Sequence, residues 1–434
     1  MSAHPGPLPD ASEGDEDGRV LSKLGPGLIT GAADDDPSGI ATYTQAGAQF
    51  GYALGWTLLI TYPLMAGIQL ASARIGRVTG KGLTCALGAL WPRPVVGIAL
   101  VLLLVANIVN LAADISAMAE VTHLAIGGHS AIYAAAFGLV SLFFQAWLPY
   151  RRYVRVLKWL TLALLAYVGV ALFAHVDWAS ALKYTLVPHI QFNADWIKMV
   201  VAILGTTISP YLFFWQASQE VEEIDRVRPD QPLRHAPEQG LRQLRRLRVD
   251  TWVGMGFSNA IAFFVVLAAA ATLHANGQTD IQSTAQAAEA LRPVAGPAAF
   301  ALFALGIVGT GLLALPVLAG SAAYACAEFL QVRCSLERPV REAPGFYAIL
   351  GVALLMGMGI SLTGIDPMKS LVWAAIINSI ISVPIMVGVM LAASNAKVMG
   401  QFVLPLRWKV LGWGATALMA AACVAYGLAA LFAR

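Results

Sequence analysis

The sequence contains little charge for its length. Only 12% of its 434 residues are Asp, Glu, Lys or Arg, whereas about 25% is usual for a soluble domain. Hydrophobic residues make up 58%, which also excludes an intrinsically disordered chain. The net charge of +3 is too small to favour nucleic acid as a partner. A polytopic membrane protein is the class that remains.

The sequence also lacks the usual signatures of redox, metal-cluster and enzyme chemistry. Its four cysteines form no CxxC pair, and its seven histidines form no HxxxH pair. We find no catalytic constellation and expect no enzymatic activity. We see no signal peptide, and residues 1–24, rich in Pro, Gly, Asp and Glu, predict a disordered cytoplasmic tail.

Long apolar runs, by contrast, are abundant. A helix needs about 20 mostly apolar residues to cross the hydrocarbon core of a membrane. The sequence predicts an all-α membrane protein with eleven such spans, at residues 26–50, 53–73, 95–125, 130–148, 156–175, 198–218, 251–274, 296–326, 344–362, 368–393 and 408–432.

The loops between the predicted spans alternate in charge. Those after the second, fourth, sixth, eighth and tenth spans hold most of the 28 Lys and Arg residues. Basic loops stay on the cytoplasmic side of a membrane. We therefore expect a multi-pass protein of the cell inner (plasma) membrane, with its N-terminus in the cytoplasm and its C-terminus outside.

Two of the spans carry helix-breaking polar residues. The first contains Asp34-Asp35-Asp36-Pro37, and the sixth contains Gly205-Thr206-Thr207-Ile208-Ser209-Pro210-Tyr211. Such breaks are tolerated inside a membrane where they line a binding site. Because they lie five spans apart, we predict two inverted repeats of five helices, at residues 25–175 and 198–393, with 408–432 as an additional helix.

The first break favours a cation. An unwound segment exposes backbone carbonyls, and an adjacent carboxylate adds the negative charge that replaces part of a cation's hydration shell. Asp36, directly before Pro37, is the predicted first ligand. The alternative is that the three aspartates cap the helix at the membrane surface, but apolar or small residues precede them and the helix resumes afterwards. Asp35 is a predicted second ligand or cation-attracting charge, unless it or Asp34 pairs with a polar neighbour.

These breaks resemble those of the Nramp family of divalent metal transporters. Asp36-Pro37 and the following stretch 45–52 resemble the family's first helix, whose motif is Asp-Pro-Gly-Asn, and 204–211 resembles its sixth, whose motif is Met-Pro-His. The resemblance covers the first ten spans. It implies a LeuT-type fold and import of divalent metal ions by alternating access. The divalent cation is then cargo rather than a cofactor, and we expect a monomer in the lipid bilayer.

The resemblance also implies a metal site. Asp36 falls on the family's metal-binding Asp, and Ala33 and Thr206 fall on positions that offer backbone carbonyls. Two positions depart from the family pattern. Gly39 stands where the family has a ligand Asn, and Ser209 stands where it has a ligand Met.

Other polar residues inside the spans relate to the same resemblance. Asn378 lies two residues from the position of a metal-binding Gln, so it is either a ligand or a helix-packing residue. Asp114 matches an Asp of the family's proton route, but Ala117 replaces the Glu one turn later. Tyr211 and Gln216 replace two histidines associated with proton movement, which leaves these three polar residues as a proton route or gate.

The departures change the expected cargo. Methionine sulfur is a soft ligand that favours transition metals, whereas Ser209 offers a hard oxygen or empty space. Mg²⁺ keeps much of its water and suits a roomy carboxylate site. We therefore predict a Mg²⁺ transporter that also accepts Mn²⁺, with weak or absent proton coupling, similar to the Nramp-related magnesium transporters. The alternatives are a proton-coupled Mn²⁺/Fe²⁺ symporter, an organic-solute transporter and a non-transporting sensor.

Overall fold

The computed structural model describes residues 26–148, 163–173, 176–227, 230–364 and 366–432, and all regular elements within them are helices. Nine helical segments of this part of the chain are long and apolar enough to cross a membrane. One of the nine, Pro37–Thr79, contains parts of two predicted spans. The predicted tail at 1–24 lies outside the described residues, as does much of the predicted span 156–175. The nine segments therefore agree with the eleven predicted spans.

The helices follow the predicted division of the chain. Those of the first half are α1 (Pro26–Asp34), α2 (Pro37–Phe50), α3 (Gly55–Thr79), α5 (Arg93–Ile126), α6 (Ser130–Trp147) and α8 (Leu165–Phe173). Those of the second half are α10 (Ala194–Thr207), α11 (Pro210–Arg226), α12 (Gly240–Thr272), α15 (Ala299–Leu330), α16 (Pro344–Ser361) and α17 (Pro367–Ser394). The last helix is α19 (Leu406–Phe432).

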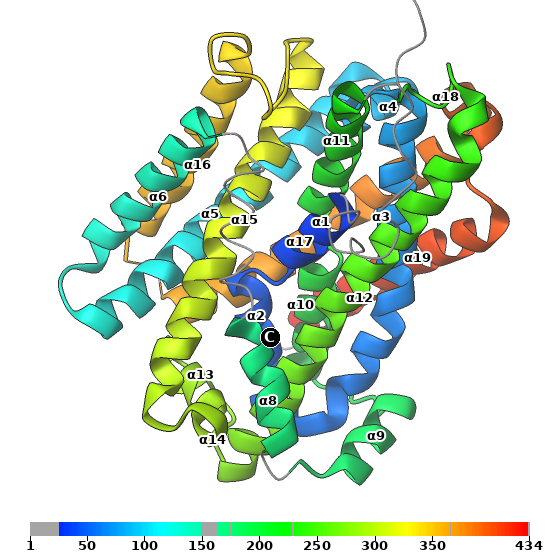
Figure 1. Ribbon diagram of the computed structural model, residues 1–434. Helices are drawn as coiled ribbons and strands as arrows, with labels where there is room; N and C mark the ends of the chain where they lie inside the picture. The colour runs from blue at the N-terminus through cyan, green and yellow to red at the C-terminus, as the bar shows by residue number, and fades with distance from the viewer. Residues whose placement is uncertain (1–25, 149–162, 174–175, 228–229, 365, 433–434) are drawn as a thin grey trace, which may run out of the picture.

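Short connecting helices mark the two ends of the bundle. They are α4 (Leu83–Gly88), α9 (Trp178–Leu186), α13 (Thr284–Ala288), α14 (Arg292–Ala295) and α18 (Ala396–Met399). Figure 1 places α4 and α18 at the upper end and α9, α13 and α14 at the lower end. Connections after the second and tenth predicted spans thus lie opposite those after the fifth and seventh, as alternating crossings require. Which end faces the cytoplasm stays a prediction from loop charge.

The structure confirms that the first and sixth spans are broken. The first stops at Asp34 and resumes at Pro37, and the sixth stops at Thr207 and resumes at Pro210. Each second half begins with proline. A proline is favourable there because the first N–H of a helix has no intrahelical partner to lose.

Both breaks are held by very close helix packing. Helix α1 packs on α12, and α10 packs on α17. A Cβ atom on Gly31 would lie 2.2 Å from the carbonyl oxygen of Gly254, and one on Gly205 would lie 1.9 Å from that of Ala375. The backbones therefore touch beside each break, which small residues make possible.

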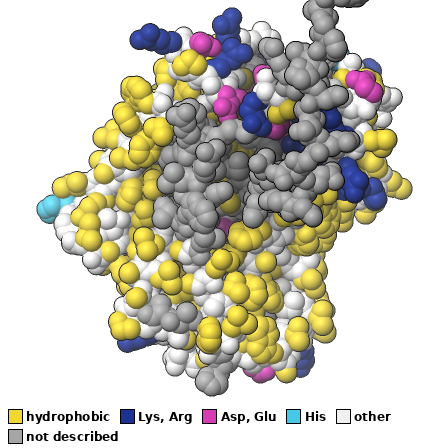
Figure 2. All heavy atoms as spheres, in the orientation of Figure 1, with side chains coloured by type: hydrophobic (Ala, Val, Ile, Leu, Met, Phe, Trp, Pro, Cys, Tyr) yellow, Lys and Arg dark blue, Asp and Glu magenta, His cyan; other side chains and the backbone are white. Residues whose placement is uncertain are grey.

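The outer surface agrees with a membrane location. Figure 2 shows hydrophobic side chains over much of the flanks of one face, with Lys and Arg concentrated toward the upper end. Large apolar side chains of α5 and α6, such as Ile98 and Phe143, are more than half exposed. Such side chains are expected where a helix faces lipid rather than water.

Candidate metal centre

Asp36 forms the centre of the first break. Its side chain caps α2 by accepting a hydrogen bond from the Gly39 backbone N–H at 2.8 Å. The same carboxylate oxygen accepts a second bond from the Ser38 hydroxyl at 2.7 Å. Asp36 is only 2% exposed. The local sequence therefore folds around this carboxylate, which holds it in a fixed position inside the bundle.

Tyr211 joins the second break to the first. Its hydroxyl donates to the other carboxylate oxygen of Asp36 at 3.2 Å and lies 3.5 Å from the carbonyl oxygen of Ala33. Tyr211 is the second residue of α11, so one side chain from the sixth span reaches a carboxylate and a carbonyl of the first. The structure thus brings together three residues predicted for the site.

The second break is neutral, and its serine is turned away from any ligand role in this conformation. The Ser209 hydroxyl bonds the carbonyl oxygens of Gly205 at 2.8 Å and Thr206 at 3.1 Å. It therefore occupies one side of a carbonyl predicted to bind the cation. The carbonyl of Ile208 accepts from the Ser382 hydroxyl on α17 at 2.9 Å. Ser382 was not predicted, because only the fold brings α17 to this break.

Gly39 faces the second break across a narrow gap. A Cβ atom on Gly39 would lie 3.3 Å from the Thr206 hydroxyl oxygen and 3.4 Å from the Asp34 carbonyl oxygen. The loss of a side chain at this position does not leave an open space, since Thr206 approaches it. The predicted roominess of the site is therefore smaller than the sequence alone suggests in this closed conformation.

Asp34 and Asp35 meet a serine on α12. The Ser258 hydroxyl lies 2.7 Å from one oxygen of Asp34 and 3.2 Å from one oxygen of Asp35. The second oxygen of each carboxylate has no hydrogen-bonding partner among the described residues. Both side chains are at most 2% exposed. This contact corresponds to the predicted alternative of pairing with a polar neighbour, and a role of Asp35 as a ligand stays a prediction.

Asp114 faces the first break from α5. It is fully buried, and neither of its carboxylate oxygens meets a hydrogen-bonding partner within the described part of the chain. It lies close enough to Asp36 for the two charges to repel each other, and the backbone of Ser38 faces it. A buried carboxylate without a partner is costly unless a cation or proton reaches it. Asp114 therefore belongs to the same electrostatic region as Asp36.

Two predicted residues are engaged elsewhere. Asn378 and Asn110 form a reciprocal amide pair, with N···O distances of 2.9 and 3.3 Å. This is the helix-packing alternative for Asn378, and Asn110 bonds it rather than Asp114. Gln216 accepts a hydrogen bond from the Thr30 hydroxyl at 2.5 Å, which links α11 to α1. Gln216 thus tethers the first half-helix, as a gating residue would.

One sulfur atom lies near the first break. A Cβ atom on Gly311 would lie 2.4 Å from the sulfur of Met118 and 3.3 Å from Pro37. Met118 is on α5, one turn after Asp114, and is fully buried. The sequence gave no reason to select it, because its spacing from Asp114 is also that of an ordinary packing residue.

No ready-made metal cluster is present in the part of the chain that the structure describes. Nowhere in it do three His, Cys, Asp or Glu side chains converge as ligands. A cation at the breaks would therefore depend on Asp36, backbone carbonyls and hydroxyl groups rather than on a cage of charged side chains. Hard oxygen donors of this kind suit Mg²⁺, Ca²⁺ and Mn²⁺.

Comparison with known proteins gives a consistent assignment. A sequence model of the family described as "Natural resistance-associated macrophage protein-like" (Nramp) matches residues 27–429. The divalent metal cation transporter MntH of Klebsiella pneumoniae (strain 342) is 29% identical over 406 residues, which cover 91% of this chain and 90% of the relative.

Solved structures share the fold at low sequence identity. A crystal structure of the Eremococcus coleocola manganese transporter superposes with a TM-score of 0.73 at 16% identity, covering 95% of this chain and 87% of that one. The outward-open, substrate-bound structure of a Na⁺-coupled sialic acid symporter gives a TM-score of 0.55 at 11% identity, with coverage of 95% and 90%. The arrangement of helices is thus shared by transporters of metals and of organic solutes.

Proposed function

Because the chain belongs to the natural resistance-associated macrophage protein-like (Nramp) family, we propose that it imports divalent metal cations across the plasma membrane by alternating access. One contact supports this most directly. The Tyr211 hydroxyl reaches both the Asp36 carboxylate and the Ala33 carbonyl, so the two helix breaks converge on one set of oxygen ligands. Half-helix ends at mid-membrane are where transporters of this architecture bind their cargo.

The cation enters our proposal as a hard ion, Mg²⁺ foremost and Mn²⁺ as well. Ser209 supplies no sulfur, and the groups around Asp36 are carbonyl, hydroxyl and carboxylate oxygens. Mg²⁺ would reach them with part of its water retained, as it does in other protein sites. Release of the Ser38 and Tyr211 hydroxyls from Asp36 would free this carboxylate for the ion.

Proton coupling is weak or absent in this proposal. Ala117 provides no titratable group one turn after Asp114, and Tyr211 and Gln216 are held by hydrogen bonds to α1 or its break. A chain of exchangeable protons would need groups whose charge changes near neutral pH, which histidine provides and these residues do not. Transport would then run down the cation gradient.

The second candidate is a proton-coupled Mn²⁺/Fe²⁺ symporter. The sulfur of Met118 near Pro37 favours it, because a soft donor at the break would bind transition metals. Asp114, buried without a partner, would carry the proton. An organic anion is a weaker candidate despite the shared fold, since three aspartates at the break repel a carboxylate.

Transport in liposomes distinguishes these functions. The protein is reconstituted with an internal Mn²⁺-quenched dye and a second, pH-sensitive dye, and external Mg²⁺ is titrated against Mn²⁺. Asp36→Asn is compared with Asp177→Asn, because both residues cap a helix N-terminus and only Asp36 lies at a break. Asparagine caps helices as well as aspartate does, so both variants should fold.

Each function has its own outcome. Millimolar Mg²⁺ that slows Mn²⁺ influx without acidifying the lumen, in wild type and Asp177→Asn but not in the inactive Asp36→Asn, supports the proposal. Mn²⁺ influx that ignores Mg²⁺ and acidifies the lumen indicates the symporter. Absence of metal flux in the folded wild type would contradict both and favour an organic solute or a sensor.

A further inference from the structure

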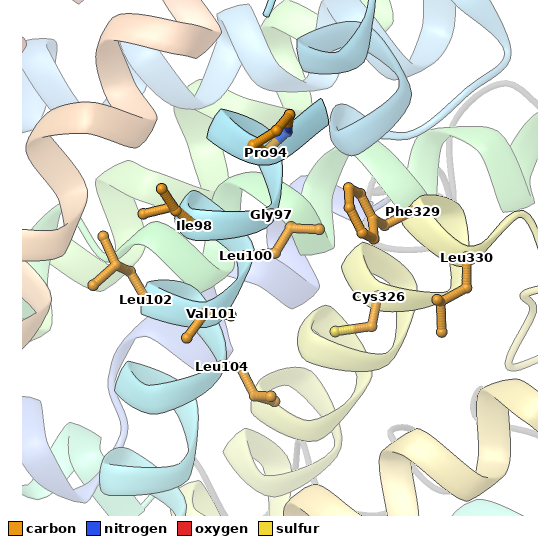
Figure 3. A pocket seen from close by; sticks show the side chains of 10 residues that line it. All are labelled: Pro94, Gly97, Ile98, Leu100, Val101, Leu102, Leu104, Cys326, Phe329 and Leu330. Carbon is orange, nitrogen blue, oxygen red and sulfur yellow. The ribbon is translucent and has the colours of Figure 1, made fainter. Parts of the chain in front are cut away.

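A groove unrelated to the helix breaks lies between α5 and α15. It has a volume of about 510 Å³ and an almost wholly apolar lining. Figure 3 shows the side chains along its walls, which come from the first turns of α5 and the last turns of α15. They include Ile98, Val101 and Leu104 on α5 and Cys326, Phe329 and Leu330 on α15.

The groove has the depth of one membrane leaflet. Its lining on α5 runs from Pro94 to Leu104, which corresponds to about 15 Å at the rise of an α-helix. The hydrocarbon core of a bilayer is about 30 Å thick. Ile98 and Val101 are 63% and 60% exposed, so the groove is open to its surroundings along this depth. Its surroundings at this position are lipid chains.

A cation stands at the mouth of the groove. Arg93 is the first residue of α5 and is exposed. Its guanidinium carbon lies 5.1 Å from the centre of the Phe329 ring, and Phe329 is part of the groove wall. Among the described residues no carboxylate forms an ion pair with Arg93, although other basic residues such as Arg77 and Arg246 have acidic partners. Arg93 is thus fixed in place with its charge uncompensated.

We propose that this groove binds an anionic phospholipid, with its phosphate on Arg93 and an acyl chain along α5 and α15. Guanidinium groups bind phosphate oxygens through paired hydrogen bonds. Basic residues at the membrane surface attract anionic lipid headgroups, and apolar walls of leaflet depth receive the chain. By the loop-charge prediction, the lipid comes from the cytoplasmic leaflet.

Two variants separate the headgroup from the chain. Arg93→Gln removes the charge and keeps the helix start. Gly97→Leu fills the groove, since a Cβ atom on Gly97 meets only Phe329, at an ordinary 3.5 Å. Arg338→Gln is the matched control, because Arg338 is another half-exposed arginine with an acidic partner of its own, Glu342.

The measurement uses the delipidated full-length protein in mixed micelles. Bound phosphatidylglycerol and phosphatidylcholine are counted by native mass spectrometry, and a phosphatidylglycerol with a photoreactive acyl chain is cross-linked and mapped. We expect wild type and Arg338→Gln to retain phosphatidylglycerol in preference. Arg93→Gln should reduce that preference by about fivefold, the effect of about 1 kcal/mol for one interfacial basic residue. Gly97→Leu should abolish cross-links to Cys326 and its neighbours.

Several results would overturn the proposal. Unchanged lipid preference in Arg93→Gln would remove the headgroup site, and cross-links confined to other helices would remove the groove. If soluble glycerol phosphate displaced the lipid as effectively as phosphatidylglycerol does, the site would bind free phosphate rather than a phospholipid. Circular dichroism and melting of each variant confirm that the folded protein was compared.

Discussion

The two helix breaks share a backbone design and differ in charge. Each consists of two residues outside a helix followed by a proline that starts the next half-helix. At the first, the Asp36 side chain caps α2 and accepts three hydrogen bonds. At the second, Ser209 makes no cap and bonds carbonyls of its own helix. Proline is therefore enough to interrupt a helix, and the neighbouring residue decides whether the interruption attracts a cation.

The largest expected effect comes from removing the charge of the first break. Asp36→Asn should lower Mn²⁺ uptake by about 100-fold or more, because loss of even an indirect partner of a metal ligand costs about 10–100-fold. The melting temperature should change little, since asparagine still caps α2. Uptake in proteoliposomes, together with a thermal melt, measures both. Near-normal uptake by the well-folded variant would show that the two breaks do not differ in the way proposed.

Giving the second break a soft ligand tests the comparison from the other side. Ser209→Met should raise the preference for Mn²⁺ over Mg²⁺ by about tenfold, which equals about 1.4 kcal/mol. Competition between the two ions in a binding titration measures this ratio. Ser209→Ala is the control, because it removes the hydroxyl without adding sulfur. An equal change in both variants would mean that the sulfur is not responsible.

The contact between the breaks has a smaller expected effect. Tyr211→Phe removes a donor that competes with the cation for Asp36. Mn²⁺ affinity should rise by about fivefold, since a hydrogen bond contributes about 0.5–1.5 kcal/mol net. Isothermal titration calorimetry measures the affinity directly. A loss of affinity would instead identify the Tyr211 hydroxyl as a ligand.

The smallest effect is expected at the support of the second break. Ser382→Ala removes the donor to the Ile208 carbonyl, and that carbonyl is then left unsatisfied in a buried position. Stability should fall by about 1–3 kcal/mol while Asp36 and its ligands are untouched. A lower melting temperature with an unchanged Mg²⁺/Mn²⁺ ratio is the expected pair of observations. A changed ratio would show that the second break also selects the ion.

The sequence predicted the features that follow from local composition. Apolar runs predicted the spans, and the Asp36-Pro37 and Ser209-Pro210 pairs predicted both breaks. Contacts between distant helices were not predictable, because they depend on the rotation of one helix against another. Ser258, Ser382 and the Asn110–Asn378 pair all belong to this class. The same limit applies to the Ser209 hydroxyl, whose direction is set by a rotamer that sequence does not specify.

The backbone contact between Gly31 and Gly254 has a consequence for mutational tolerance. A methyl group on Gly31 would overlap the Gly254 carbonyl, as one on Gly205 would overlap that of Ala375. In a saturation library grown on different metal supplements, both positions should lose every substitution in all media, because the defect lies in assembling the helices. Enrichment that depends on the supplement should be confined to positions that touch the ion. Such a screen would distinguish residues that build the fold from residues that choose its cargo.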